Sequence, residues 1–378
     1  MKESPLLLSE PYRLCFPLGI LSLLWGVLLW LPLIWNPDVY PVLTHRYLVI
    51  NGFAGLFIGG FLMTAVPRFS KTMYARSFEL ISFVTVTLIG IFLAYQENEK
   101  AIFVISALQV LIIFFFLLSR IFKRKENPPY SFVFIFVGLF LWLLSAVLSL
   151  FFDPENFRHL HHEGAIAAII LGVGGRLIPG ILGHVEIVSA QREHYEKPVS
   201  IIKTVPWHFW PVIGSFVVSY FIPEAIGLWV RLLSVFIVAI SYWKLFSFPK
   251  HKTALTWSIW TCSWFIVVSF CLKALWSDGV IHGTHSFFIS GIVLMSILIA
   301  TRVIVSHGPK LNELENSKVI YVVTFFIIFA AATRVSAFLM PDGYLRHLSY
   351  SSIVLVFAVL IWCFKYLKYV FVQKKALN

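Results

Sequence analysis

Charged residues are scarce in this 378-residue sequence. Only 13% of the residues are Asp, Glu, Lys or Arg, whereas 59% are hydrophobic and the mean hydropathy is +0.85. About a quarter of the residues are charged in soluble globular domains, whose surfaces must be hydrated, so the composition excludes a soluble domain of this size. The 37 Phe and 13 Trp also exclude intrinsic disorder, because disordered chains are poor in aromatic residues.

Cysteine is equally scarce, and no C-x-x-C spacing occurs. The four cysteines lie inside apolar runs, and we interpret them as packing residues. The net charge of +12 does not indicate nucleic acid, because the Lys and Arg residues lie in short loops between apolar runs. We therefore expect membrane lipid, and no nucleic acid, around this chain.

Long apolar runs fill almost the whole sequence. A helix needs roughly 20 apolar residues to cross a bilayer, and this criterion predicts an all-α polytopic bundle of about twelve transmembrane helices in a single integral membrane domain, residues 1–378. The predicted spans are 14–35, 45–66, 78–95, 101–122, 131–152, 162–182, 206–222, 225–246, 255–276, 282–305, 319–340 and 349–371.

The positions of Lys and Arg predict the orientation, because these residues are retained on the cytoplasmic side. With twelve spans, 21 of the 30 Lys and Arg residues lie at the termini and in the loops of one side, and 5 lie in the alternate loops. Both termini are therefore expected in the cytoplasm. We expect a multi-pass protein of the cell inner membrane.

This orientation places seven of the twelve histidines at or near the outer ends of spans. Ionisable residues at membrane depth are costly and usually belong to a functional site, and neutral imidazole is a common ligand of metals and haem iron. The seven residues are His45, His159, His161, His162, His282, His285 and His347.

The spacing of three of these histidines indicates an internal repeat. His45, His159 and His285 are each four spans apart, at the start of the second, sixth and tenth spans, and an arginine follows 17 residues after both His159 and His285. We therefore predict three four-helix units, about 1–125, 126–250 and 251–378. His45, His159 and His285 are the predicted cofactor ligands.

Two further features extend this prediction. His162 and His282 each lie three residues from another candidate, so each pair can share one helix face and hold a metal. Arg46 and Arg158 adjoin outer histidines, and their guanidinium groups can pair with a haem propionate. The alternatives are that the histidines cap helix ends and that the arginines are simply solvated there.

Glycines form stripes in the second span (Gly52, Gly55, Gly59, Gly60) and in the sixth (Gly172, Gly174, Gly175). Close packing of helices explains such stripes; close approach of a flat macrocycle is the alternative.

Several segments resemble the NnrS family. Residues 45–67, H-R-Y-L-V-I-N-G-F-A-G-L-F-I-G-G-F-L-M-T-A-V-P, are similar to its W-H-x-H-E-M segment, which leads to G-F and then G-F-L-L-T-A-V-P. Residues 159–166 and 285–291 resemble the repeated H-A-L-T-V-G-A-x pattern, and residues 301–308 resemble A-R-V-A-L-G-H-T-G. His45 matches the first His of the opening motif, but Tyr47 replaces the second and Leu48 replaces the Glu.

The resemblance implies a membrane protein that contains haem and copper and is associated with denitrification and with resistance to nitric oxide. At a coarser level the chain is similar to haem–copper oxidases, with outer-half histidines on the second, sixth and tenth spans. The H-P-E-V-Y copper-site pattern and the seventh-helix His pair of those enzymes are absent, which disfavours oxygen-reducing proton pumping.

Three functions follow from these features. The first is a haem- and copper-binding protein that handles nitric oxide. The second is a secondary transporter, because twelve helices with internal repeats are typical of those proteins; none of the 18 Asp and Glu residues is predicted at mid-span, where a transporter would need them. The third is a metal-free membrane assembly protein.

Overall fold

The computed structural model describes residues 6–32, 41–193, 200–307 and 311–372. Helices dominate these ranges and no strand occurs in them, which confirms the predicted all-α class. Ten helical stretches are long and apolar enough to cross a membrane: Val42–Ser70, Ser77–Tyr95, Glu99–Phe122, Tyr130–Phe151, Pro154–Leu182, Glu224–Ser241, Ala254–Leu275, Ser277–His307, Glu313–Leu339 and Pro341–Phe371.

The first and seventh predicted spans correspond to shorter apolar helices. Helix α2 (Tyr12–Leu28) has 17 residues and α11 (Phe209–Val218) has 10. Among the described residues, ten spans are thus long and apolar enough to cross a membrane. The total of twelve spans and the division into three repeat units stay predictions.

The second, sixth and tenth spans are each assembled from several segments. The second comprises α3 (Val42–Tyr47), the π-helix η2 (Leu48–Ala54) and α4 (Gly55–Ser70). The sixth comprises η4 (Pro154–Asn156), the π-helix η5 (Leu160–Ala165) and α8 (Ile166–Leu182). The tenth comprises η6 (Ser277–Gly279), α14 (Val280–Ser286), the π-helix η7 (Phe287–Val293) and α15 (Leu294–His307).

The remaining elements are more regular. The other spans contain α5 (Ser77–Tyr95), α6 (Glu99–Phe122), η3 (Tyr130–Phe132), α7 (Val133–Phe151), α12 (Glu224–Ser241), α13 (Ala254–Leu275), α17 (Lys318–Ser336), η8 (Ala337–Leu339), η9 (Pro341–Gly343), α18 (Tyr344–Tyr366) and η10 (Leu367–Phe371). The short connecting helices are α1 (Leu6–Ser9), α9 (Val185–Glu193), α10 (Ile201–Thr204) and α16 (Leu311–Glu315).

Local signals in the sequence explain several helix ends. The Asn98 side chain accepts a hydrogen bond from the backbone of α6, and Thr253 does the same for α13. Pro67 and Pro179 each lie three residues before the last residue of their helices. Helix α8 then ends at Gly183, whose φ of 87° is a left-handed conformation that favours glycine.

The three spans with π-helices form the centre of the bundle. Between 72% and 78% of their apolar windows is buried, compared with 33% to 56% in the other seven spans. The peripheral helices therefore present their apolar side chains to lipid, and the central three are enclosed by protein. The histidine-bearing helices are thus the core of this fold.

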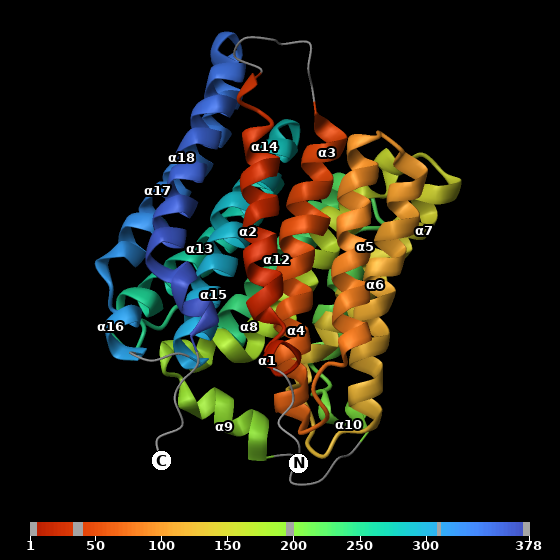
Figure 1. Cartoon of the computed structure of the whole chain (residues 1–378), viewed down its shortest axis with the longest axis vertical. Coiled ribbons are helices and arrows are strands. Elements are labelled where there is room, and N and C mark those ends of the chain that lie inside the picture. The colour runs from red at the N-terminus through yellow and green to blue at the C-terminus, as the bar shows by residue number, and fades with distance from the viewer. Residues whose placement is uncertain (1–5, 33–40, 194–199, 308–310, 373–378) are drawn as a thin grey trace.

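The first and last described helices lie at the same end of the bundle (Figure 1). The Arg13 guanidinium of α2 donates to the carbonyl oxygens of Val370 and Val372, at the end of the chain's last span. We call this the inner end, and the opposite end, where α3 and α14 lie, the outer end. The common end agrees with the predicted orientation.

Candidate functional site

Each of the three central spans contains a π-helix next to its histidines. The segment η2 begins three residues after His45, η5 begins directly after His159, and η7 begins two residues after His285. π-Helical segments are rare and occur frequently at functional sites. The same distortion at three histidine positions identifies the outer half as the candidate site.

A close approach to α2 accompanies the π-helix of the second span. A Cβ built on Gly52 would lie 2.0 Å from Ser22 Oγ, and this hydroxyl donates to the Leu48 carbonyl at 2.8 Å. Only glycine fits this contact. Gly172 and Gly175 likewise touch Ser131 and its neighbours on the adjoining span, so close helix packing accounts for these three glycines.

The His45 ring is oriented through Nδ1. This atom lies 2.8 Å from the Gly26 carbonyl oxygen and 2.8 Å from the Trp30 indole Nε1. A carbonyl only accepts, so the bond to Gly26 requires Nδ1–H and leaves the lone pair on Nε2, whereas the Trp30 contact requires the other tautomer. Histidines that bind metals usually donate their second nitrogen to a carbonyl or carboxylate.

His285 shows the same arrangement on the tenth span. Its Nδ1 lies 2.8 Å from the Ile281 carbonyl oxygen, so Nε2 again carries the lone pair. His45 and His285, two of the three predicted cofactor ligands, thus both lie in the outer half, on the second and tenth spans.

His159, the third predicted cofactor ligand, lies against another neighbour. Its Nε2 lies 3.3 Å from the Tyr220 carbonyl oxygen, and the two rings stack with centroids 5.9 Å apart. Tyr220 also donates through its hydroxyl to Glu163, 3.2 Å away. His159 and Glu163 thus share Tyr220, because the π-helix places residues four apart on one face.

The next two histidines, His161 and His162, line an outer pocket of about 490 Å³ between the second, fourth and sixth spans. His161 stacks on Trp142 with ring centroids 4.6 Å apart, and its buried Nε2 has no hydrogen-bond partner in the part of the chain that the structure describes. His162 lies within electrostatic range of Arg46, across the pocket. An imidazole nitrogen without a partner suits a polar ligand.

The two predicted propionate-binding arginines meet at the rim of this outer pocket. Arg46 Nη1 lies 3.0 Å from Glu155 Oε1, and Arg158 pairs with the other oxygen of the same carboxylate. The spans that carry them are therefore close enough for both guanidinium groups to bind one carboxylate, which is the chemistry of a haem propionate.

A polar network supports the floor of the outer pocket. Asn51 Nδ2 donates to Ser106 Oγ and to Gln109 Oε1, each at 3.0 Å, and Trp142 Nε1 donates to Ser106 at 2.8 Å. Gln109 returns a hydrogen bond to the Asn51 carbonyl at 3.0 Å, inside the π-helix η2. The network joins the π-helix to the pocket wall and to the ring that stacks on His161.

The two predicted metal ligands are in different places. His162 lines the outer pocket, whereas His282 is buried near α17, where its Nδ1 lies 3.0 Å from Arg334 Nη1. Among the described residues no group of three or more His, Cys, Asp and Glu could hold a metal ion. The described residues thus form no three-ligand copper site, whereas the chemistry of His45 and His285, two imidazoles whose Nδ1 contacts a backbone carbonyl, is compatible with haem iron.

A buried charge cluster near this site was not predicted from the sequence. Glu163 Oε2 lies 2.5 Å from Lys273 Nζ, and Glu163 Oε1 lies 3.2 Å from Arg231 Nη1. Both cations lie in or next to apolar spans, a signal that could have drawn attention to them. Their partner was missed because Glu163 follows two histidines near a helix end.

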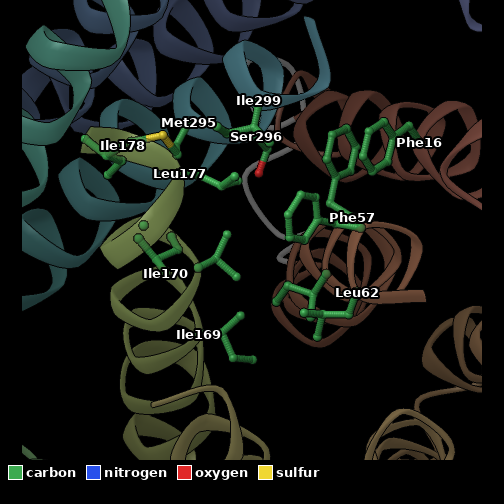
Figure 2. Close-up of a pocket in the computed structure, with 14 residues that line it drawn as sticks. Phe16, Phe57, Leu62, Ile169, Ile170, Leu177, Ile178, Met295, Ser296 and Ile299 are labelled. Atoms are coloured by element: carbon green, nitrogen blue, oxygen red, sulfur yellow. The ribbon is translucent and has the colours of Figure 1, made fainter. Parts of the chain in front are cut away.

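An apolar cavity of about 610 Å³ lies on the inner side of the three π-helices (Figure 2). It lies between α2, α4, α8 and α15, and Phe16, Phe57, Ile170, Leu177, Met295 and Ile299 are among its lining residues. Among the described residues that line it, Ser296 has the single polar side chain and none is a histidine, so this cavity offers no imidazole ligand.

Comparison with known proteins identifies the family. No curated protein matches the chain. A family model described as "NnrS protein" matches residues 6–374, nearly the whole chain. The chain therefore belongs to the NnrS family, as the motifs of the second, sixth and tenth spans indicated, and is a multi-pass membrane protein of the nitric oxide response.

Proposed function

We propose that this protein binds haem in the outer half of the bundle, in the cell inner membrane, and that it serves in the response to nitric oxide and nitrosative stress. The observation that carries the proposal is the pair His45 and His285. Both rings can donate Nδ1–H to a backbone carbonyl at 2.8 Å, and both belong to the outer ends of the buried central spans. An imidazole held in this way presents the lone pair of its Nε2 to a metal.

In this proposal His45 and His285 would hold the haem, which would supply a one-electron couple and an iron able to bind nitric oxide once one of the two imidazoles is released. The Ile281 carbonyl selects the Nδ1–H tautomer of His285, and the Gly26 carbonyl selects the same tautomer of His45 in competition with the Trp30 indole. Arg46 and Arg158, which share Glu155, would neutralise the haem carboxylates. Ser22 and the Asn51 network hold the π-helix, and with it the His45 segment, in position.

His159 has a supporting role in this proposal, because its Nε2 faces the Tyr220 carbonyl. His161 and His162 line the outer pocket, and His161 Nε2, which has no partner among the described residues, can bind a polar diatomic ligand. The proposal names haem and not copper, because the described residues form no three-ligand metal site.

One observation favours the alternative function, a secondary transporter. Glu163 is a buried carboxylate within a span, as transporters require. However, Lys273, Arg231 and Tyr220 all donate to it. A carboxylate held by three donors is suited to a fixed charge and poorly suited to exchange with a substrate.

The purified protein tests the proposal directly. In mild detergent we expect a Soret absorption band that shifts when nitric oxide is added, with the haem quantified after extraction. His347→Ala is a matched control for variants of His45 and His285, and it should keep the band. Like them, His347 is a half-buried histidine at the outer end, and it contacts Ser336. A colourless preparation that takes up no added haem would contradict the proposal and favour the transporter.

A further inference from the structure

The buried charge cluster of Glu163, Lys273 and Arg231 joins three spans. Glu163 belongs to η5 of the sixth span, Arg231 to α12 and Lys273 to α13. The exposed fractions are 4% for Glu163, 0% for Lys273 and 5% for Arg231. Water therefore screens these charges very little.

The three residues carry one negative and two positive charges, so their sum is +1. The carboxylate only accepts, from Lys273 at 2.5 Å, Arg231 at 3.2 Å and the Tyr220 hydroxyl at 3.2 Å. Moving the proton from Lys273 to Glu163 would neutralise both groups and leave the sum unchanged. The excess positive charge is thus independent of where that proton resides.

This excess charge lies beside the segment that carries His285. A Cβ built on Gly283 would lie 2.4 Å from Lys273 Cγ, so glycine lets the lysine side chain pack against α14. Lys273 Nζ also lies 5.2 Å from the ring centroid of Phe287, the first residue of η7. Gly283 and Phe287 flank His285 by two residues on either side.

Other charged groups at the outer end do not cancel this excess. Glu224 is exposed at the start of α12, where solvent screens it. Arg334 is buried near His282 and His285 and adds positive charge. The protein around His285 is therefore electropositive.

A fixed positive charge in a medium of low dielectric constant stabilises an added electron. We propose that the Glu163–Lys273–Arg231 cluster raises the reduction potential of the haem bound near His285. The inference rests on the haem proposed above. The cluster would change the reduction potential electrostatically, without contact between its residues and the iron.

Charge-changing variants test the proposal in a redox titration followed by the Soret band. Glu163→Gln increases the cluster charge to +2 and should raise the midpoint potential, whereas Lys273→Met reduces it to zero and should lower it. The double variant E163Q/K273M restores +1 and should return close to the wild-type value. A tenfold change in the ratio of reduced to oxidised haem at fixed potential corresponds to about 59 mV.

Tyr220→Phe is the matched control, because it removes one hydrogen bond to Glu163 and changes no charge, so its midpoint potential should equal that of the wild type. If the single variants do not fold, the triple variant E163Q/K273M/R231Q contains no buried charge at the cluster, and its midpoint potential should lie below that of the double variant.

Shifts of the same sign in E163Q and K273M, or equal potentials in the double and triple variants, would overturn the inference. Either result would indicate that the cluster has a purely structural role. Absence of haem from the wild-type protein is a separate result, which would overturn the proposed function itself.

Discussion

The outer and inner halves of this bundle have opposite chemistry. The outer half contains the three π-helices, His45 and His285, a polar pocket and a buried charge cluster with a net positive charge. The inner half contains an apolar cavity lined almost entirely by carbon. Its ion pairs lie at the helix ends: Arg68 with Glu10 and Arg302 with Glu315 have partly exposed arginines, whereas Arg13 with Glu10 and Arg120 with Glu79 have buried ones.

The difference concerns where the fold contains features that reduce its stability. Buried charges, imidazole nitrogens without a partner and π-helices reduce stability, and they are often retained because they serve a site. Both ends of the bundle have buried charges, and at the inner end His184 Nε2 has no partner among the described residues. The three π-helices, however, all adjoin the outer histidines. The outer half is therefore the region in which function is expected.

The largest expected effect comes from removing a proposed haem ligand. His45→Ala and His285→Ala should each reduce haem content to about a tenth of wild type or less, since even indirect ligand partners change affinity 10- to 100-fold. His307→Ala is the inner-half control, because His307 Nδ1 also contacts the carbonyl four residues earlier, at 2.7 Å. Extraction and quantification of haem compares the haem content of the three variants. An equal loss of haem in His307→Ala would contradict the assignment of the haem to the outer half.

The second effect concerns the stability of buried and exposed ion pairs. Lys273→Met leaves Glu163 with one cation fewer in the interior and should cost about 3–5 kcal/mol. Arg302→Met removes the Arg302–Glu315 pair, whose arginine side chain is 38% exposed, and should cost about 1 kcal/mol or less. Thermal unfolding in detergent compares the two, and an equal cost would show that the outer cluster has no special environment.

Two serines sharpen the comparison further. Ser106→Val leaves Trp142 Nε1 without its acceptor in the outer pocket and removes one of the two acceptors of Asn51 Nδ2, and it should cost about 1–3 kcal/mol. Ser296→Val adds carbon to the wall of the apolar cavity and should cost less than about 1.5 kcal/mol. A larger loss of melting temperature for the Ser296 variant would indicate that the inner cavity is polar.

The smallest effect is a pH dependence at the inner end, outside the spans. Burial lowers the pKa of His184 below its ordinary value, and the Glu186 carboxylate 3.5 Å away offsets this only in part. The unfolded chain then binds the proton more readily, so His184 reduces stability as pH falls through about 6.5. His184→Gln should flatten the decline in melting temperature between pH 7.5 and 5.5, and an unchanged slope would show that His184 does not contribute.

Much of the fold could be predicted from the sequence because lipid imposes a length and composition on each span. The predicted ranges match ten long helices, and the two exceptions, α2 and α11, are shorter than apolar content suggested. Proline and glycine residues in the runs limit helix length in a way that apolar composition does not reveal.

The site was predicted only in part, because its geometry depends on contacts between distant segments. His45 and His285 stay predicted cofactor ligands on the basis of their spacing. The prediction that His159 and His162 share a face assumed 3.6 residues per turn, whereas η5 is a π-helix, and the two residues contact different neighbours. Glu163 and Lys273 are 110 residues apart, and only the folded chain pairs them.

The most direct test of the central claim is a cryo-electron microscopy map of the pigmented protein purified from the membrane. We expect density for a planar macrocycle in the outer half, in contact with Nε2 of His45 and of His285. A map in which the cofactor fills the apolar cavity near Phe57 and Met295, or in which both imidazoles contact protein alone, would contradict the account.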